Sequence, residues 1–228
     1  MLLVPPMAFK LPSTASLPNP TAYWKFDEGS GSTAADSSGN GYTLSSSGAT
    51  WVSGKFVNGV NTSDNGKYWT STASGLLTLG LTSLTAAVWY NSTNTTNGSW
   101  GKIISFNTDV GFSLNVFRST NDTPQMRIWI GGSESYAAAS STYSITNPTG
   151  VWNHVCGVYD GSSITLYING VKRAQQTGVS GTIGGSPTTF YVGNSGGNVA
   201  AGCEDELRLY YNIAFSSSQV TTLYNLIP

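Results

Sequence analysis

Charged side chains are scarce in this chain. Lys, Arg, Asp and Glu make up 9% of its 228 residues, and the formal net charge is -1. A protein that binds nucleic-acid phosphates or an anionic membrane surface needs a cluster of Lys and Arg. With 10 Lys and Arg in total, we expect no such basic face, so neither nucleic acid nor a membrane surface is a predicted partner.

Histidine, cysteine and long apolar runs are also scarce. With one His and two Cys, the sequence gives no good candidate for a Ser-His-Asp catalytic triad or for a zinc site with several His and Cys ligands. No run approaches the roughly 18 apolar residues of a membrane-spanning helix. The apolar start has no basic region before it and is interrupted by Pro5 and Pro6, so we predict no secretory signal.

The chain does contain a regular series of short strand-like runs separated by turn residues. They are rich in β-branched and aromatic residues and lie at 21–26, 84–90, 102–106, 112–117, 125–130, 152–160, 163–169, 188–193 and 205–211. Dipeptides such as Asp160-Gly161 and Asn169-Gly170 suit tight hairpins. Only the tail, residues 216–227, has apolar residues at helical spacing after a Ser cap, which predicts one short helix. Many strands without helices between them favour one all-β domain, an antiparallel sandwich.

Four segments in a fixed order narrow the type of sandwich. They are "AYWKFDEGSGSTAADSSGNGYTL", "GKFVNGVNTSDNGKYW", "VWNHVCGVYDGSSITLYINGV" and "GCEDELRLYYNIAFSSSQVTTLYN". In this series the chain resembles the laminin-G-like domains of the concanavalin A-like lectin/glucanase superfamily, over nearly everything from Thr21 to Asn225. The resemblance implies a jelly-roll sandwich of two antiparallel sheets, one of them concave. We therefore divide the chain into a Pro-rich extended arm, residues 1–20, and a jelly-roll domain, residues 21–228.

The resemblance places Trp152 and His154 on a core strand. We expect His154 to be a hydrogen-bonded structural residue, because a single imidazole without a second catalytic or metal-binding side chain does not form a functional site. A direct functional role is the alternative. Cys156 and Cys203 are expected to be free buried thiols, and a disulfide between them would require an oxidising compartment.

Catalysis is not predicted. Glu204 and Glu206 have the spacing of two strand residues on one face, about 6.5 Å apart, near the roughly 5 Å of a retaining glycosidase. Hydrolases of the superfamily resemble one another in a Glu-x-Asp-x-x-Glu strand motif, and "EDELRL" does not provide it. The lone His also lacks the Gln-x-His context of jelly-roll polysaccharide lyases. A diverged glycoside hydrolase is the least favoured of our functional hypotheses.

The sequence also offers oxygen ligands for a hard-metal site. Calcium needs six to eight oxygens, which carboxylates and Gly-rich loops expose readily. Lectin-like jelly rolls often hold one structural calcium ion where the first and last strands meet, and the resemblance carries this role to Asp27, the carbonyl of Gly39 and Asp205. The alternative is that Asp27 and Asp36 cap turns through side-chain hydrogen bonds.

A sugar site cannot be assigned to particular residues from the sequence. Aromatic faces pack against the C–H surface of sugar rings, and Trp100, Trp129 and Tyr136 flank polar loops. The alternative is that these aromatic side chains pack in the core. A glycan ligand is therefore expected from the resemblance alone.

The Pro-rich arm is predicted to bind another protein. Its prolines favour extension, and its apolar residues, Leu2, Leu3, Val4, Met7 and Phe9, would settle into a partner's groove. The alternative is that the arm covers a sheet edge of its own domain. These features predict a non-catalytic lectin-like surface module tethered to a larger assembly, such as a virion capsid-decoration or appendage protein, located on a virion surface or outside the cell. A carbohydrate-binding module of a secreted or cell-surface protein is the runner-up.

Overall fold

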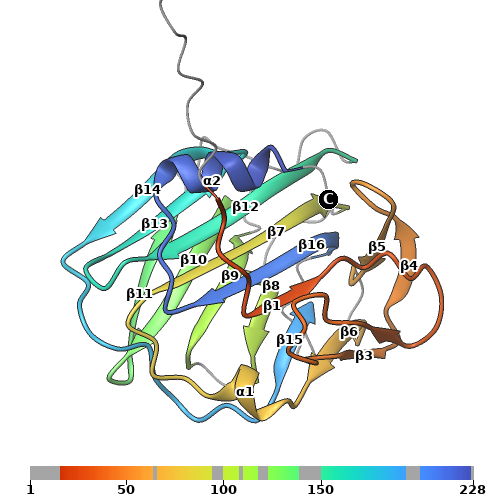
Figure 1. Cartoon of the computed structure of the whole chain (residues 1–228), viewed down its shortest axis with the longest axis horizontal. Helices are drawn as coiled ribbons and strands as arrows, with labels where there is room; N and C mark the ends of the chain where they lie inside the picture. Colours follow the sequence, from red (N-terminus) through yellow and green to blue (C-terminus); the bar gives the residue numbers. More distant parts are fainter. Residues whose placement is uncertain are drawn as a thin grey trace, which may run out of the picture.

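A computed structural model describes residues 16–63, 66–93, 100–107, 110–117, 123–138, 150–193 and 201–226. In these residues the chain forms two packed antiparallel sheets, here called sheet A and sheet B, with a C-terminal helix lying over the outside of sheet A (Figure 1). The predicted all-β sandwich of two antiparallel sheets is confirmed.

Sheet A has eight strands in the order β14-β13-β12-β7-β16-β5-β4, and β1 also pairs with β16. Their bounds are β1 (Ala22–Trp24), β4 (Thr50–Ser53), β5 (Asn58–Asn61), β7 (Leu84–Ser92), β12 (Trp152–Tyr159), β13 (Ser163–Ile168), β14 (Val171–Thr177) and β16 (Gly202–Tyr211). The first and last strands of the domain thus lie side by side, with Tyr23 opposite Arg208.

Sheet B has eight strands in the order β11-β10-β9-β8-β15-β6-β3-β2. Their bounds are β2 (Thr33–Ala34), β3 (Leu44–Ser47), β6 (Tyr68–Ser71), β8 (Trp100–Phe106), β9 (Phe112–Phe117), β10 (Thr123–Ile130), β11 (Ser133–Ala138) and β15 (Phe190–Gly193). A short helix, α1 (Ser74–Leu77), follows β6 at the edge of the sandwich.

The core lies between the sheets because alternate residues of each strand point inward. Leu114, Met126 and Ile128 of sheet B and Val88 and Leu166 of sheet A are fully buried in one apolar cluster. Burying an apolar side chain of this size contributes roughly 1.5–3 kcal/mol. The alternation leaves the other residues of the same strands on the outer face of each sheet.

The predicted C-terminal helix is present as α2 (Ser217–Tyr224). Ser216 and Gln219 form a capping box, in which the Ser216 hydroxyl accepts from the Gln219 amide and the Gln219 side chain accepts from the Ser216 amide. Such a cap contributes about 1 kcal/mol. Val220 and Leu223 pack over the outer face of sheet A against Cys156, so this face has a second apolar cluster of its own.

Several elements were not predicted. The strands between residues 33 and 71 are short and rich in Ser, Thr and Asn, and β14 is exposed along nearly all its length, so neither carries a clear apolar alternation. The expectation that no helix precedes the tail is wrong for α1. This four-residue helix contains a Gly and has no side-chain cap, so no local signal marks it.

Candidate functional site

The outer face of sheet B carries a continuous row of polar and aromatic side chains. Cross-strand pairing joins Ser45 to Thr70, Thr70 to Tyr191, and Tyr191 to Ser105. Further along the sheet, Ser113 lies opposite Arg127, and Arg127 opposite Tyr136. Their neighbours in each strand are core residues, so these side chains lie on the face turned away from sheet A. We call this outer surface of sheet B the sheet B face. The members discussed below are Ser45, Tyr68, Thr70, Ser105, Ser113, Asn115, Gln125, Arg127, Trp129, Glu134, Tyr136 and Tyr191.

Tyrosines supply the aromatic surface of the sheet B face. The rings of Tyr68 and Tyr191 meet edge to face with centroids 5.4 Å apart, and both side chains are partly exposed. Tyr136 is 50% exposed and packs beneath the guanidinium group of Arg127. Trp129, by contrast, is 8% exposed. Of the aromatic residues singled out by sequence, Tyr136 therefore offers a ring to a ligand, whereas Trp129 is buried and the side chain of Trp100 lies outside the described residues.

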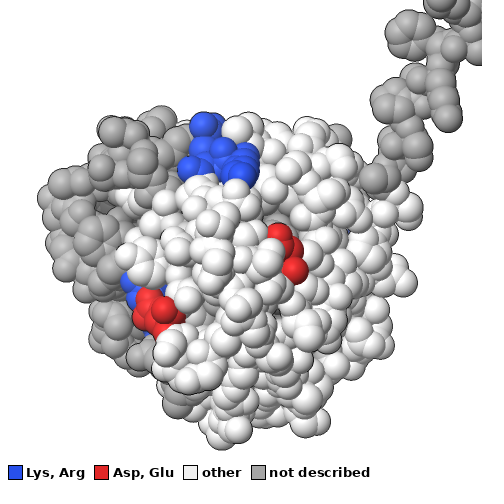
Figure 2. All heavy atoms as spheres, turned by 90° about the vertical axis from the view of Figure 1, so that its left-hand side faces the viewer, with Lys and Arg blue, Asp and Glu red and all other residues white. Residues whose placement is uncertain are grey.

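The positive charge of Arg127 is compensated within the face. Its guanidinium forms an ion pair with Glu134 at 2.8 Å and donates hydrogen bonds to the Gln125 side chain at 3.3 Å. Seen from the side on which β14 and β11 lie in Figure 1, the described surface carries one group of Lys and Arg side chains and a few Asp or Glu side chains, and most of the rest is uncharged (Figure 2). Apart from Arg127 and Glu134, the named members of the sheet B face are hydroxyl, amide and aromatic residues, of which Ser105, Ser113, Asn115 and Gln125 are buried.

Asn115 has an unsatisfied polar atom on this face. Its amide nitrogen donates to the Ser113 hydroxyl oxygen at 2.8 Å, but its Oδ1 is buried and has no hydrogen-bond partner among the residues that the structure describes. A buried acceptor left unpaired costs roughly 1–3 kcal/mol, and native proteins rarely keep one without a reason. Both side chains are buried, with exposed fractions of 3% for Asn115 and 1% for Ser113.

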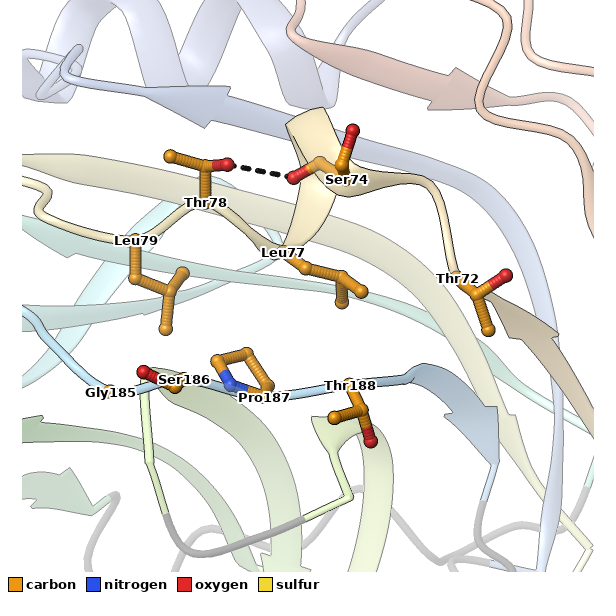
Figure 3. A pocket seen from close by; sticks show the side chains of 9 residues that line it. All are labelled: Thr72, Ser74, Leu77, Thr78, Leu79, Gly185, Ser186, Pro187 and Thr188. Atoms are coloured by element: carbon orange, nitrogen blue, oxygen red, sulfur yellow. Dashed lines mark hydrogen bonds between the residues drawn. The ribbon is translucent and has the colours of Figure 1, made fainter.

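Two hollows adjoin the sheet B face at its β3–β6 end. The first, here the β3–β6 hollow, has a volume of about 330 Å³. It is lined by Gly41, Thr43, Ser45, Thr70, Ser71, Thr72 and Ala73. The second, here the rim groove, has a volume of about 530 Å³ and lies between α1 and the segment before β15 (Figure 3). It is lined by Thr72, Ser74, Leu77, Thr78, Leu79, Gly185, Ser186, Pro187 and Thr188.

The outer face of sheet A holds most of the ionisable residues that the sequence singled out. His154 and Asp205 both pair with Trp89, from β12 and β16 on either side of β7. Both are almost fully buried, and in the described structure His154 Nδ1 and Asp205 Oδ1 have no hydrogen-bond partner. The His154 ring packs edge-on against Trp89, with centroids 5.3 Å apart, and against Tyr224 of α2. His154 is thus a buried residue of the framework, but the hydrogen bond expected for its ring is not made at Nδ1.

Burial explains the electrostatics of this region. It lowers the pKa of His154 to about 3, and the positive charge of Arg208 contributes to the shift. Burial also raises the pKa of Asp205 to about 7, although amide hydrogen bonds from Phe56 and Lys55 to its Oδ2 oppose the rise. The imidazole is therefore neutral at physiological pH, and the Asp205 carboxyl group keeps its proton to a much higher pH than an exposed Asp does.

The predicted calcium ligands lie on separate elements. The Asp27 carbonyl accepts a hydrogen bond from Asn58 at 2.9 Å, Gly39 lies in the loop that precedes β3, and Asp205 caps the turn at Lys55. The described residues contain no group of three or more His, Cys, Asp or Glu side chains that could hold a metal ion. The unpaired Oδ1 of Asp205 would nevertheless suit a cation, so calcium stays a prediction.

Asp36 follows the turn-capping alternative. Its two carboxylate oxygens accept hydrogen bonds from the amides of Tyr23, Ser38 and Tyr42 and from the Ser38 hydroxyl, at 2.8–3.0 Å. These hydrogen bonds hold the pKa of Asp36 below its ordinary value against the opposing effect of burial. They tie the loop after β2 to the first strand.

Glu204 and Glu206 do not form a catalytic pair. A bulge lies between Asp205 and Arg208, and Glu206 has a positive φ of 55°. Glu204 lies opposite Tyr90 on the core side and accepts from the Thr62 hydroxyl at 2.8 Å, whereas Glu206 is bound by Tyr23 and Arg208 on the outer side. The spacing in the sequence suggested one face, and the bulge places the two carboxyl groups on opposite faces.

Cys156 and Cys203 are both free and buried, as predicted. Burial raises the pKa of both thiols, for Cys203 to about 12 with a further contribution from Glu204. Neither is a reactive thiolate at neutral pH.

The residues predicted to bind a partner, Leu2, Leu3, Val4, Met7 and Phe9, lie outside the described residues. Leu17, near the end of the predicted arm, packs against the apolar cluster beneath α2. Neither helix that the structure describes is long and apolar enough to cross a membrane.

Sequence reasoning missed Tyr68, Tyr191 and Asn115. Alternation within "TTFYVG" and "FSLNVF" could have placed Tyr191 and Asn115 opposite the apolar residues of their strands. It could not have shown that Tyr68 and Tyr191 meet, because that contact depends on the pairing of β6 with β15.

Comparison with known proteins gives one family and a group of related folds. The model of a family described as the concanavalin A-like lectin/glucanases superfamily matches residues 63–221. A search of curated proteins finds no match.

Solved structures share the fold. Domain 4 of AbnA, an extracellular GH43 arabinanase from Geobacillus stearothermophilus, in complex with arabinotriose, superposes with a TM-score of 0.68 at 21% identity, covering 91% of this chain and 98% of that domain. The binding domain of Paraclostridial Mosquitocidal Protein 1 superposes with a TM-score of 0.70 at 16% identity, and the match covers 90% of this chain and 51% of that domain. The botulinum neurotoxin serotype D ligand-binding domain in complex with N-acetylneuraminic acid superposes with a TM-score of 0.69 at 14% identity. This match covers 90% of this chain and 50% of that domain. This chain therefore spans about half the length of the two toxin domains.

Proposed function

Because this chain belongs to the concanavalin A-like lectin/glucanases superfamily, we propose that it is a glycan-binding module and that the sheet B face carries its binding site. The observation that carries the proposal is the combination of a partly exposed tyrosine pair, Tyr68 and Tyr191, with a row of polar residues on the same face. Tyrosine rings can pack against the C–H face of a sugar, and hydroxyl and amide groups beside them can bind its hydroxyls.

The related structures support a binding function. Two of them are complexes with a carbohydrate, arabinotriose in one and N-acetylneuraminic acid in the other. The carboxylates of β16 do not favour catalysis, because the bulge separates Glu204 from Glu206. We therefore propose binding without turnover.

A glycan microarray tests this proposal. Wild-type protein should bind a subset of the glycans, and Tyr191→Ala should weaken that binding at least about tenfold, equivalent to about 1.4 kcal/mol. Tyr191→Phe, which keeps the ring, should retain most of it. Gln176→Ala on the exposed strand β14 is a control for surface substitution and should have no effect. Equal binding by wild type and Tyr191→Ala would contradict the proposed site.

We also propose that the module belongs to the surface of a larger assembly, such as a virion, to which residues 1–20 tether it. The five prolines and the apolar side chains of this segment support the proposal, and the packing of Leu17 beneath α2 gives the tether a fixed starting point. Deleting residues 1–15 should leave the melting temperature nearly unchanged and prevent recovery of the protein with its assembly from the producing cells. Normal incorporation of the truncated protein would contradict tethering, and a large loss of stability would favour an arm that covers its own domain.

A further inference from the structure

The sheet B face continues without a break into the two hollows. Tyr191 lies directly opposite Thr70, which lines the β3–β6 hollow. Thr72, two residues further along, lines both that hollow and the rim groove. A ligand that stacks on Tyr191 therefore has a direct path across Thr72 to α1.

The rim groove combines apolar and hydroxyl-bearing side chains. Leu77 and Leu79 project from one wall toward Pro187 on the other, and hydroxyl residues such as Ser74 and Thr78 lie along the edge (Figure 3). The Thr78 hydroxyl donates to the Ser74 carbonyl at 2.8 Å, so its oxygen is left to accept a hydrogen bond. Sugar rings likewise combine apolar C–H faces with hydroxyl edges.

Neither hollow offers a charge to a ligand. All lining residues of both are uncharged. A carboxylate placed there would lose water without gaining a counter-ion, which is costly. Arg127, at the other end of the sheet, is already paired with Glu134.

From this continuity and this lining, we infer that the ligand is a linear neutral oligosaccharide, which runs from Tyr191 across Thr72 into the rim groove. The inference rests on the proposed function and adds the class, charge and direction of the glycan. It predicts that the affinity of the protein rises with the length of the oligosaccharide and that acidic sugars within the oligosaccharide weaken binding.

The test uses the full-length protein and an array of neutral linear oligosaccharides, from disaccharides to octasaccharides, with sialylated and uronic-acid-containing chains of matched length. Thr72→Leu fills the junction between the hollows and removes its hydroxyl. Thr72 is exposed, so the variant should fold. Thr177→Leu, at an exposed position of β14, is the matched control.

Wild type and Thr177→Leu should bind the longest neutral chains at least about tenfold more tightly than the shortest of the same sugar, a gain of about 1.4 kcal/mol. Thr72→Leu should remove this gain and leave binding of the shortest chains unchanged. Preference for acidic chains, affinity independent of length, or an undiminished gain in Thr72→Leu would each overturn the inference. If any of these occurs while Tyr191→Ala still weakens binding at least about tenfold, the proposed function stands. Absence of binding to every glycan would contradict both.

Discussion

Asp205 is buried with one oxygen unpaired, and replacing it with Asn should change how stability depends on pH. The amide side chain of the Asp205→Asn variant would keep an oxygen for the Lys55 and Phe56 amides, whose distances to Asp205 Oδ2 are 2.7 and 3.2 Å. An amide cannot ionise. Asp205→Asn therefore resembles the protonated form of the native residue at every pH.

The size of the effect follows from the pKa. Burial raises the pKa of Asp205 from an ordinary 3.8 to about 7. The folded protein then holds this proton more tightly than the unfolded chain does. The contribution of the protonated Asp205 to the free energy of unfolding is therefore complete below about pH 4 and is lost as the pH rises to about 7. A shift of this size corresponds to about 4 kcal/mol.

Urea unfolding of both proteins at pH 4 and pH 8, with a chelator present to remove calcium, measures the effect. Relative to wild type, Asp205→Asn should gain about 4 kcal/mol in the free energy of unfolding between these pH values. The lowered pKa of His154 and the raised pKa values of Glu204 and Glu206 also alter the pH dependence, but these residues are present in both proteins. A difference between the two proteins that does not change with pH would refute the reasoning.

Three further predictions concern Asn115, the metal and the thiols. Asn115→Leu removes an unpaired buried acceptor, so calorimetry should show stability that is unchanged or higher by up to about 2 kcal/mol; a clear loss of stability would assign Asn115 a structural role. Calcium added to chelator-treated protein should raise the melting temperature if Asp27, Gly39 and Asp205 share an ion, and identical melting curves would exclude the site. Thiol titration of denatured, unreduced protein should find two reactive groups per chain, whereas finding none would reveal a disulfide.

Sequence patterns predicted the long core strands because their apolar alternation is locally complete. β10, for example, alternates Met126 and Ile128 toward the core with Gln125 and Arg127 outward, and any pairing of the strand preserves that pattern. β14 was missed because it lies at a sheet edge with its residues largely exposed, so burial leaves no period in its sequence.

The candidate site was less predictable because it depends on register between distant segments. Tyr136 was recognised beside a polar loop, but the meeting of Tyr68 with Tyr191 requires β6 and β15 to pair across more than half of the chain. The bulge that separates Glu204 from Glu206 was also hidden, because a positive φ at Glu206 has no local marker in a residue other than Gly.

The central claim, that the sheet B face binds glycan, is tested most directly by NMR chemical-shift mapping with the neutral oligosaccharide bound most tightly on the array. Backbone amide shifts should concentrate in β6, β15 and β8 and extend to residues of α1. Shifts confined to the other side of the sandwich, in β12, β13 and α2, would contradict the account.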